Sequence, residues 1–152
     1  MRIVIDTNIL VSALLNPGSA PDSVLQTSLG ERKKQLLLSP DLLAEYEDVL
    51  NRKKFSKVFD KNDVSLFLTT LALDSIFIVP STVVTTCEDA DDNMLLALAI
   101  DGFADCIVSG DNHLLKLHPF EQIPILNAAD FMNWLSKKAT KCTRRLTLHR
   151  KI

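Results

Sequence analysis

The chain has 152 residues, of which 47% are hydrophobic and 24% charged, so a disordered or collagen-like chain is excluded because there is ample apolar surface to offset the entropy of ordering. This length allows one domain. The formal net charge is −2 at pH 7, and three widely spaced cysteines do not form a disulfide scaffold, which favours a reducing cytoplasm.

The longest run without a charged residue is too short to span a membrane. It covers residues 7–21 and is interrupted by Asn, Ser, Pro and Gly, whereas a spanning helix needs about 20 apolar residues. The apolar start of the chain faintly resembles a secretory signal, but Asp6 and Asn8 interrupt the stretch that such a signal requires. We therefore expect neither a membrane span nor a signal peptide.

Charge is distributed unevenly along the chain. Residues 137–151 contain seven Lys or Arg and no acid, so residues 1–136 hold ten bases against all 19 acids. An acidic body of this kind needs divalent metal to neutralise its carboxylates if it handles nucleic acid. We divide the chain into a domain of residues 1–136 and a basic C-terminal extension of residues 137–152. We interpret the extension as solvated, with phosphate contact as the alternative.

Short apolar runs alternate with helical patterns. The runs that predict strands are residues 3–5, 36–38, 76–79, 106–108 and 125–126. They are apolar at consecutive positions, which is typical of strands covered on both faces in a parallel sheet. Helical patterns cover residues 21–29, 39–51, 62–73, 91–101 and 128–136. The alternation predicts a three-layer α/β/α sandwich with a central parallel sheet of about five strands.

Two acidic residues follow predicted strands. Asp6 comes directly after the strand at residues 3–5, and Asp111 follows the strand at residues 106–108. In open α/β sheets, ligands bind outside the carboxyl ends of the strands, where the strand order reverses. For either residue alone, a helix N-cap is the better explanation, because Asp is favoured at that position.

Two further acids lie on the apolar faces of predicted helices. Glu45 is three residues after Leu42 and four before Val49, and Asp92 shares a face with Leu95 by the same spacing. A carboxylate on a core-facing stripe is costly unless it is paired or binds a metal. For either acid alone, a salt bridge or a helix-end charge is the more common explanation.

Together, the four acids indicate a metal site. The apolar faces contain no Lys or Arg, and the nearest bases, residues 52–54 and 57, are expected at the far end of the first of these helices. Carboxylates that converge on one pocket repel one another unless a cation is present. A ligand set of oxygen atoms favours Mg²⁺ or Mn²⁺ over zinc. Such a site activates water and stabilises the charge on a phosphodiester during its hydrolysis.

The segments at residues 3–10, 42–46, 91–99 and 109–115 resemble the PIN-domain family, and more narrowly its bacterial branch of toxin components of toxin–antitoxin pairs. The resemblance extends from Met1 to about Trp134. It implies a metal-dependent endoribonuclease that hydrolyses single-stranded RNA, with Mg²⁺ or Mn²⁺ as cofactor. It also implies a cytoplasmic protein, an antitoxin protein as partner and a homodimer.

The resemblance also assigns residue roles. It implies that four acids act both in catalysis and as metal ligands: Asp6, Glu45, Asp92 and Asp111. Asn8 and Ser109 match polar positions that orient these carboxylates. Asp92 is preferred over Asp89 and Asp91 because it lies on the apolar helical face, and we interpret the other two as favourable charges at a helix N-terminus.

Other readings of the sequence remain as alternatives. A non-catalytic PIN-like module that binds RNA or a protein is the main one, although the presence of all four acids argues against it. An aspartyl-phosphate phosphohydrolase needs a second acid where this chain has Asn8, and a response-regulator receiver needs an Asp where it has Pro80. We interpret His113 as an exposed loop residue, and the Cys and His spacings do not resemble a zinc site.

Overall fold

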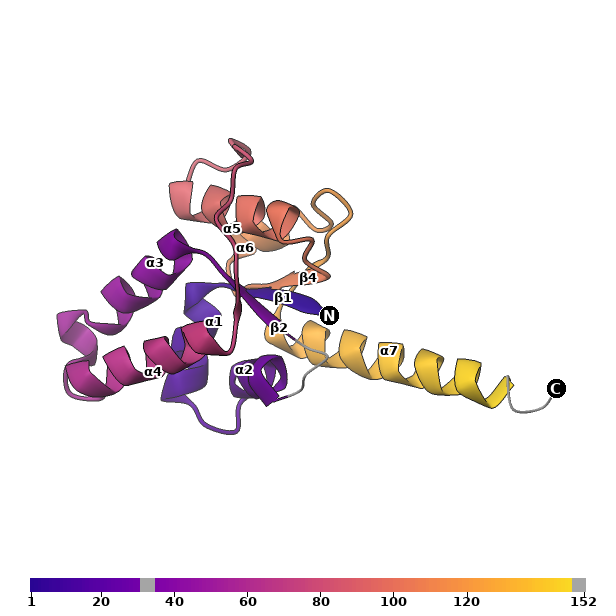
Figure 1. Ribbon diagram of the computed structural model, residues 1–152, viewed down its shortest axis with the longest axis horizontal. Coiled ribbons are helices and arrows are strands. Elements are labelled where there is room, and N and C mark those ends of the chain that lie inside the picture. The colour runs from indigo at the N-terminus through magenta and orange to yellow at the C-terminus, as the bar shows by residue number, and fades with distance from the viewer. Residues whose placement is uncertain (31–34, 149–152) are drawn as a thin grey trace.

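A five-stranded parallel sheet forms the centre of the computed structural model, which describes residues 1–30 and 35–148 (Figure 1). Its strands are β1 (Arg2–Ile5), β2 (Gln35–Leu38), β3 (Ile76–Phe77), β4 (Cys106–Val108) and β5 (Ile125–Leu126). They are arranged in the order β3-β2-β1-β4-β5, and every neighbouring pair is parallel. All five predicted strands are present, although β3 is shorter than predicted.

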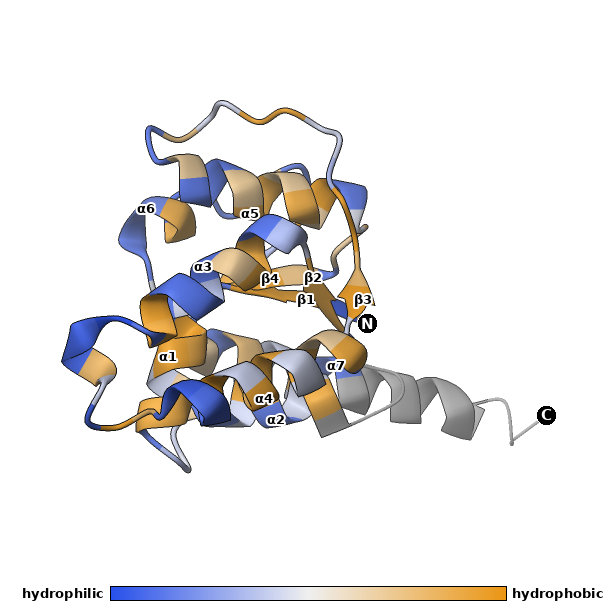
Figure 2. Ribbon diagram, turned by 60° about the vertical axis from the view of Figure 1, so that its left-hand side comes forward, coloured by the Kyte–Doolittle hydropathy of each residue, from blue (hydrophilic) through white to orange (hydrophobic). Residues whose placement is uncertain are grey.

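Helices cover both faces of this sheet. They are α1 (Thr7–Leu15), α2 (Ala20–Gly30), α3 (Pro40–Leu50), the 3-10 helix η1 (Lys53–Phe55), α4 (Lys61–Leu73), α5 (Ala90–Asp101), α6 (Asn112–Leu115) and α7 (Ala128–Leu148). Helices α5 and α6 lie on one face, and α1, α2, α4 and α7 lie on the other (Figure 2). The predicted α/β/α sandwich is therefore confirmed.

Strand β1 lies where the chain changes direction across the sheet. The strands β2 and β3 follow on one side of β1, and β4 and β5 on the other. Ile5 pairs with Val108, so the carboxyl ends of β1 and β4 are adjacent. This is the topological switch point at which open α/β sheets bind ligands.

Local sequence signals account for the start of α3. The Ser39 hydroxyl accepts a hydrogen bond from the backbone N–H of Leu42 at 3.1 Å, and Pro40 occupies the first helical position, as predicted. The buried Tyr46 hydroxyl donates to the backbone carbonyl of Ile5 at 2.5 Å. This bond fixes the middle of α3 against the carboxyl end of β1.

The helices differ from prediction in two respects. The structure adds α1, η1 and α6, which no predicted range covered. The last helix also continues past its predicted end at Ser136 to Leu148, because the intervening residues include neither Gly nor Pro. Most of the predicted basic extension is thus an extension of α7 that projects from the sandwich (Figure 1), and residues 149–152 lie outside the described residues.

A helix that crosses a membrane must be both long and apolar. No helix among the described residues has both properties.

Candidate active site

Asp6 lies at the carboxyl end of β1, and its side chain does not cap the following helix. It occupies the N-cap position of α1 but makes no side-chain hydrogen bond to the first turn. Its backbone N–H donates to the carbonyl of Val108 at 2.9 Å, and the residue is only 7% exposed. Capping of α1 therefore does not explain why the Asp6 carboxylate is buried, and its burial needs a different explanation.

Two polar side chains hold the Asp6 carboxylate from either side. The Ser109 hydroxyl donates to Asp6 Oδ2 at 2.5 Å, and Asn8 Nδ2 donates to the same oxygen at 2.7 Å. Ser109 Oγ also accepts from the Asp111 N–H at 2.9 Å, while Asn8 Oδ1 accepts from the Gly110 N–H at 3.0 Å. Because both side-chain bonds end on Oδ2, the other carboxylate oxygen has lone pairs available for a cation.

Glycine at position 110 leaves room for the Asn8 side chain. A Cβ atom there would lie 3.1 Å from Asn8 Oδ1, so the Asn8 amide would have to move by a few tenths of an ångström. The same amide donates to Asp6. The turn after β4 thus permits the approach of Asn8.

Asp111 differs from Asp6 because it does cap a helix. Its Oδ1 accepts from the His113 N–H at 2.6 Å at the start of α6. The capping explanation therefore holds for one of its oxygens. Its Oδ2 is engaged in no hydrogen bond with the described residues, so Asp111 can cap α6 and contribute an oxygen ligand at the same time.

Glu45 projects from α3 with one oxygen buried and unpaired. Its Oε2 and the Thr7 hydroxyl are both buried without a hydrogen-bond partner. Leaving a buried carboxylate oxygen unsatisfied is costly, and such an atom calls for a ligand or ion. The adjacent Tyr46 bond to β1 fixes this part of the helix.

Asp92 lies in the first turn of α5 and is half-buried. The N-cap of that helix is Asp89, whose carboxylate accepts from the Asp91 N–H at 2.9 Å. The predicted role of Asp89 as a favourable helix-end charge agrees with this contact. Asp92 takes no part in the capping, and the following Leu95 is buried in the core.

One cavity of about 440 Å³ brings the predicted acids together. The four acids that line it are Asp6, Glu45, Asp92 and Asp111. Asn8, Thr7, Asp89 and Asp91 also line it. Asp92 and Asp111 in addition line a second cavity of about 470 Å³, together with Cys87 and His113. Asp92 and Asp111 therefore lie between two hollows on the surface, whereas Asp6 and Glu45 line only the first.

Two basic residues line the first cavity as well. They are Arg52 and Lys54, which follow the end of α3. They lie just beyond the far end of that helix, as expected. The cavity extends along α3 far enough to include them.

Burial and mutual repulsion raise the pKa of three of the acids. Burial raises the pKa of Asp6, its hydrogen bonds, first that from Ser109, lower it, and the charge of Asp111 raises it. Burial also raises the pKa of Glu45. The nearby Thr7 hydroxyl, which lies outside hydrogen-bond geometry, lowers this pKa, and the charges of Asp91, Asp6 and Asp89 raise it. The pKa of Asp92 reaches about 6 through burial and then through the charges of Asp111 and Asp89. Negative charge is therefore concentrated at this part of the cavity.

The donor set of the cavity fits a hard divalent cation. Within residues 1–30 and 35–138, no Lys or Arg forms an ion pair with Asp6, Glu45, Asp92 or Asp111. Their ligand atoms are oxygens, as Mg²⁺ and Mn²⁺ prefer, and Glu45 Oε2 is unpaired. In the described part of the chain, however, no three acidic, His or Cys side chains are close enough to hold one ion as they stand. The acids face one cavity, and their repulsion opposes a closer approach.

Sequence reasoning missed several residues of this cavity. Thr7 carries no signal beyond its place after Asp6, and its buried hydroxyl is recognisable only in three dimensions. The hydrogen bond of Tyr46 to β1 was not predicted. Arg52 and Lys54 were predicted beyond the end of the helix, but their part in the lining of the cavity was not. A turn signal after α3, provided by Asn51, was the one available indication that the chain changes direction there.

The amino-acid sequence is similar to a known protein family and to a curated protein. Residues 2–113 match the family described as PIN domain. The chain is also similar to an uncharacterized protein of Methanocaldococcus jannaschii, with 33% identity over 118 residues. The similar region covers 77% of this chain and 75% of that protein. The family match includes all four acids.

Solved structures with a similar fold come from two bacteria. The crystal structure of VapBC2 from Rickettsia felis bound to a DNA fragment from their promoter superimposes with a TM-score of 0.58 and 18% identity, over 84% of this chain and 98% of that chain. The structure of VapBC-1 from nontypeable Haemophilus influenzae gives a TM-score of 0.59 and 12% identity, over 85% of this chain and 99% of that chain. At these identities, the likeness concerns the fold.

Proposed function

The chain belongs to the PIN-domain family, and we propose that it is a metal-dependent endoribonuclease that hydrolyses phosphodiester bonds of single-stranded RNA. The observation that carries this proposal is the convergence of four acids on one cavity, with no described base paired to them. Family membership supports a nuclease. The choice of RNA and the dependence on metal are our inference.

The proposed metal ligands are the four acids of the cavity. Asp6 and Asp111, at the ends of adjacent strands, hold the principal cation, and Glu45 and Asp92 complete its ligand set directly or through water. Mg²⁺ or Mn²⁺, when bound, activates water and stabilises the negative charge that develops on the phosphodiester. No nucleophilic side chain is required for this chemistry.

Two further polar residues orient the carboxylate of Asp6. Asn8 and Ser109 donate to the same oxygen of Asp6 and so fix the plane of its carboxylate. Partners of this kind orient the ligands of metal sites and tune their affinity. The pKa of Asp92 is raised in the metal-free fold, and a cation in the cavity would lower it, because positive charge favours the ionised carboxylate.

The biological setting is also a proposal. The motifs around the four acids resemble those of toxin components, so we propose that the chain is the toxin of a toxin–antitoxin pair. An antitoxin protein is then its partner, a homodimer its assembly state, and the cytoplasm its location. The basic C-terminal residues lie outside the family match and inherit no role from it.

A cleavage assay tests the proposal directly. A labelled single-stranded RNA is incubated with the protein in Mn²⁺ or Mg²⁺, with and without a chelator. A double-stranded RNA and a single-stranded DNA of the same sequence serve as matched substrates. We expect cleavage of the single-stranded RNA that the chelator abolishes. RNA binding without cleavage in either metal would instead support the non-catalytic module.

The position of the cation is tested separately. Crystals soaked in Mn²⁺ are expected to show an anomalous peak within ligand distance of Asp6 and Asp111. A peak elsewhere, or none at saturating Mn²⁺, would contradict the assigned ligand set even if the protein cleaved RNA.

A further inference from the structure

We propose that Arg52 and Lys54 bind a backbone phosphate of the RNA next to the one that is cleaved. This inference rests on the proposed function, because it requires an RNA strand in the acidic cavity. Both residues line that cavity together with the four acids. They therefore supply positive charge in a hollow whose other charged groups are carboxylates.

The end of α3 determines where these bases lie. Glu45 and Arg52 are seven residues apart, which corresponds to about 10 Å along a helix axis. After α3 ends at Leu50, the N–H of Arg52 donates to the carbonyl of Val49 at 3.2 Å, and η1 begins at Lys53. Arg52 thus lies about two helical turns from Glu45, which suits contact with a neighbouring phosphate better than contact with the cleaved one.

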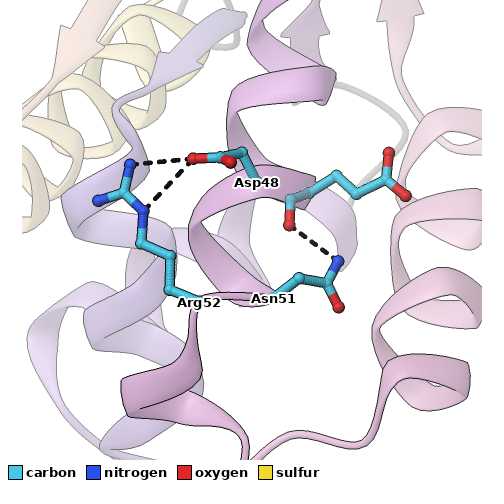
Figure 3. Close-up of polar contacts among 4 residues, drawn as sticks. Asp48, Asn51 and Arg52 are labelled. Carbon is cyan, nitrogen blue, oxygen red and sulfur yellow. Dashed lines mark hydrogen bonds and ion pairs between the residues drawn. The ribbon is translucent and has the colours of Figure 1, made fainter.

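Asp48 orients the guanidinium group of Arg52 but uses only some of its hydrogen-bond donors. Its Nε and Nη2 lie 3.3 Å and 3.0 Å from Asp48 Oδ2, one turn earlier in the chain (Figure 3). The two side chains are 53% and 69% exposed, so this pair contributes little to stability. Nη1 donates to none of the described residues, and the planar group retains donors suited to a phosphate.

Lys54 is positioned by an aromatic ring. Its Nζ lies 4.8 Å from the centroid of the Phe55 ring, which itself packs against Phe59 with 5.9 Å between ring centroids. A cation–π contact at an exposed site holds the ammonium group without neutralising it. Within the described residues, Lys54 forms no ion pair.

Electrostatics explains why the cavity needs such a pair. Residues 1–136 carry far more acids than bases, and the acidic cluster repels an approaching phosphate backbone. Contacts between Lys or Arg and phosphates supply the sequence-independent part of nucleic-acid affinity. Arg52 and Lys54 supply these contacts beside the acids, so the strand is held across the proposed metal ligands.

RNA binding measured without cleavage tests this proposal. The parent chain carries Asp6→Asn, and fluorescence anisotropy of a labelled single-stranded RNA is followed in Mg²⁺ at several salt concentrations. We expect the added changes Arg52→Gln and Lys54→Gln together to raise Kd about tenfold or more. The slope of log K against log salt should fall by about 0.7, the value for one phosphate contact with a single strand.

Matched variants separate phosphate contact from other effects. Lys57→Gln and Lys61→Gln remove two exposed charges that do not line the cavity, and this pair should leave the affinity close to that of the parent. Asp48→Asn releases Arg52, and we expect it to bind RNA as tightly as the parent or more tightly. A loss of binding in Asp48→Asn equal to that in Arg52→Gln would show that the ion pair has a merely structural role, and would overturn the proposal.

The same variants distinguish this inference from the proposed function. If the chain without substitutions cleaves RNA in Mn²⁺ but the Arg52 and Lys54 variants keep the affinity and salt slope of their parent, only the phosphate contact is refuted. If that chain neither cleaves nor binds RNA in any divalent metal, the proposed function is refuted and this inference with it.

Discussion

The hydroxyl of Ser109 donates a 2.5 Å hydrogen bond to the carboxylate of Asp6, although 103 residues separate the two in the chain. The bond joins the turn after β4 to the end of β1, two strands that lie side by side at the centre of the sheet. The same oxygen of Ser109 accepts the N–H of Asp111. One small side chain therefore sets the relative positions of two proposed metal ligands.

We predict that Ser109→Ala weakens metal binding while preserving the fold. The Asp6 carboxylate loses a donor and the Asp111 N–H loses its acceptor, and removal of such orienting contacts typically lowers metal affinity by about 10- to 100-fold. Calorimetric titration with Mn²⁺ measures the change. Ser65→Ala, at an exposed position of α4, is the control. An unchanged Mn²⁺ affinity would show that Ser109 does not act as an orienting residue.

Asp6→Asn should abolish RNA cleavage without reducing stability. Burial raises the pKa of Asp6, and the charge of Asp111 adds to this, so the ionised carboxylate is disfavoured in the metal-free fold. A neutral amide removes that unfavourable charge, while its oxygen still accepts from Ser109. Cleavage in Mn²⁺ and thermal unfolding in EDTA are measured for this variant and for Asp63→Asn, an exposed control. Mn²⁺-dependent cleavage by the Asp6→Asn chain would exclude the proposed mechanism.

The strands could be predicted because their sequence reflects burial on both faces. Leu36 to Leu38 and Cys106 to Val108 are fully buried in the structure, as their uninterrupted apolar runs indicated. Helix α1 escaped prediction because it, too, is largely buried. Four of its residues from Ile9 to Ala13 are buried and leave no clear polar stripe, and Asp6 gives no capping bond that would mark its start.

The acids of the cavity could be predicted from their positions in the sequence, whereas the presence of the two bases in its lining could not. A strand end and an apolar helical face are local features, and they were enough to single out Asp6, Asp111, Glu45 and Asp92. Arg52 and Lys54 were correctly placed beyond the end of α3, but their place in the lining of the cavity depends on how far the cavity extends along that helix. The spacing of residues in the sequence carries no information on the extent of a cavity, so this feature could be found only in the structure.

Tyr46→Phe is predicted to cost about 1 kcal/mol of stability, a typical net value for one lost hydrogen bond. The buried hydroxyl donates to the carbonyl of Ile5, so its loss loosens α3 beside Glu45. Urea unfolding measures the free energy, and the cleavage rate at saturating Mn²⁺ measures the effect on the site. Thr69→Val, which removes an exposed hydroxyl bond within α4, is the control. An unfolding free energy equal to that of the original chain would contradict the role of this bond.

The stability of the metal-free protein should depend on Asp92 in a defined pH window. Burial, followed by the charges of Asp111 and Asp89, raises the pKa of Asp92 from 3.8 to about 6 in the fold. Below pH 3.8 the residue is protonated in both states and has no effect. As the pH rises toward 6, the unfolded chain releases this proton while the folded chain retains it. The contribution of Asp92 therefore becomes destabilising across this range and is constant above it.

Comparison with Asp92→Asn isolates this contribution from that of the other acids. In EDTA, the Tm of Asp92→Asn should match that of the original chain near pH 3.5 and exceed it increasingly up to about pH 6. Asp63→Asn should show no such rise. Saturating Mn²⁺ should reverse the order near neutral pH, because a bound cation stabilises the ionised Asp92 and the amide is a poorer ligand. A Tm difference in EDTA that is independent of pH would mean that the charge of Asp92 is already compensated in the metal-free cavity.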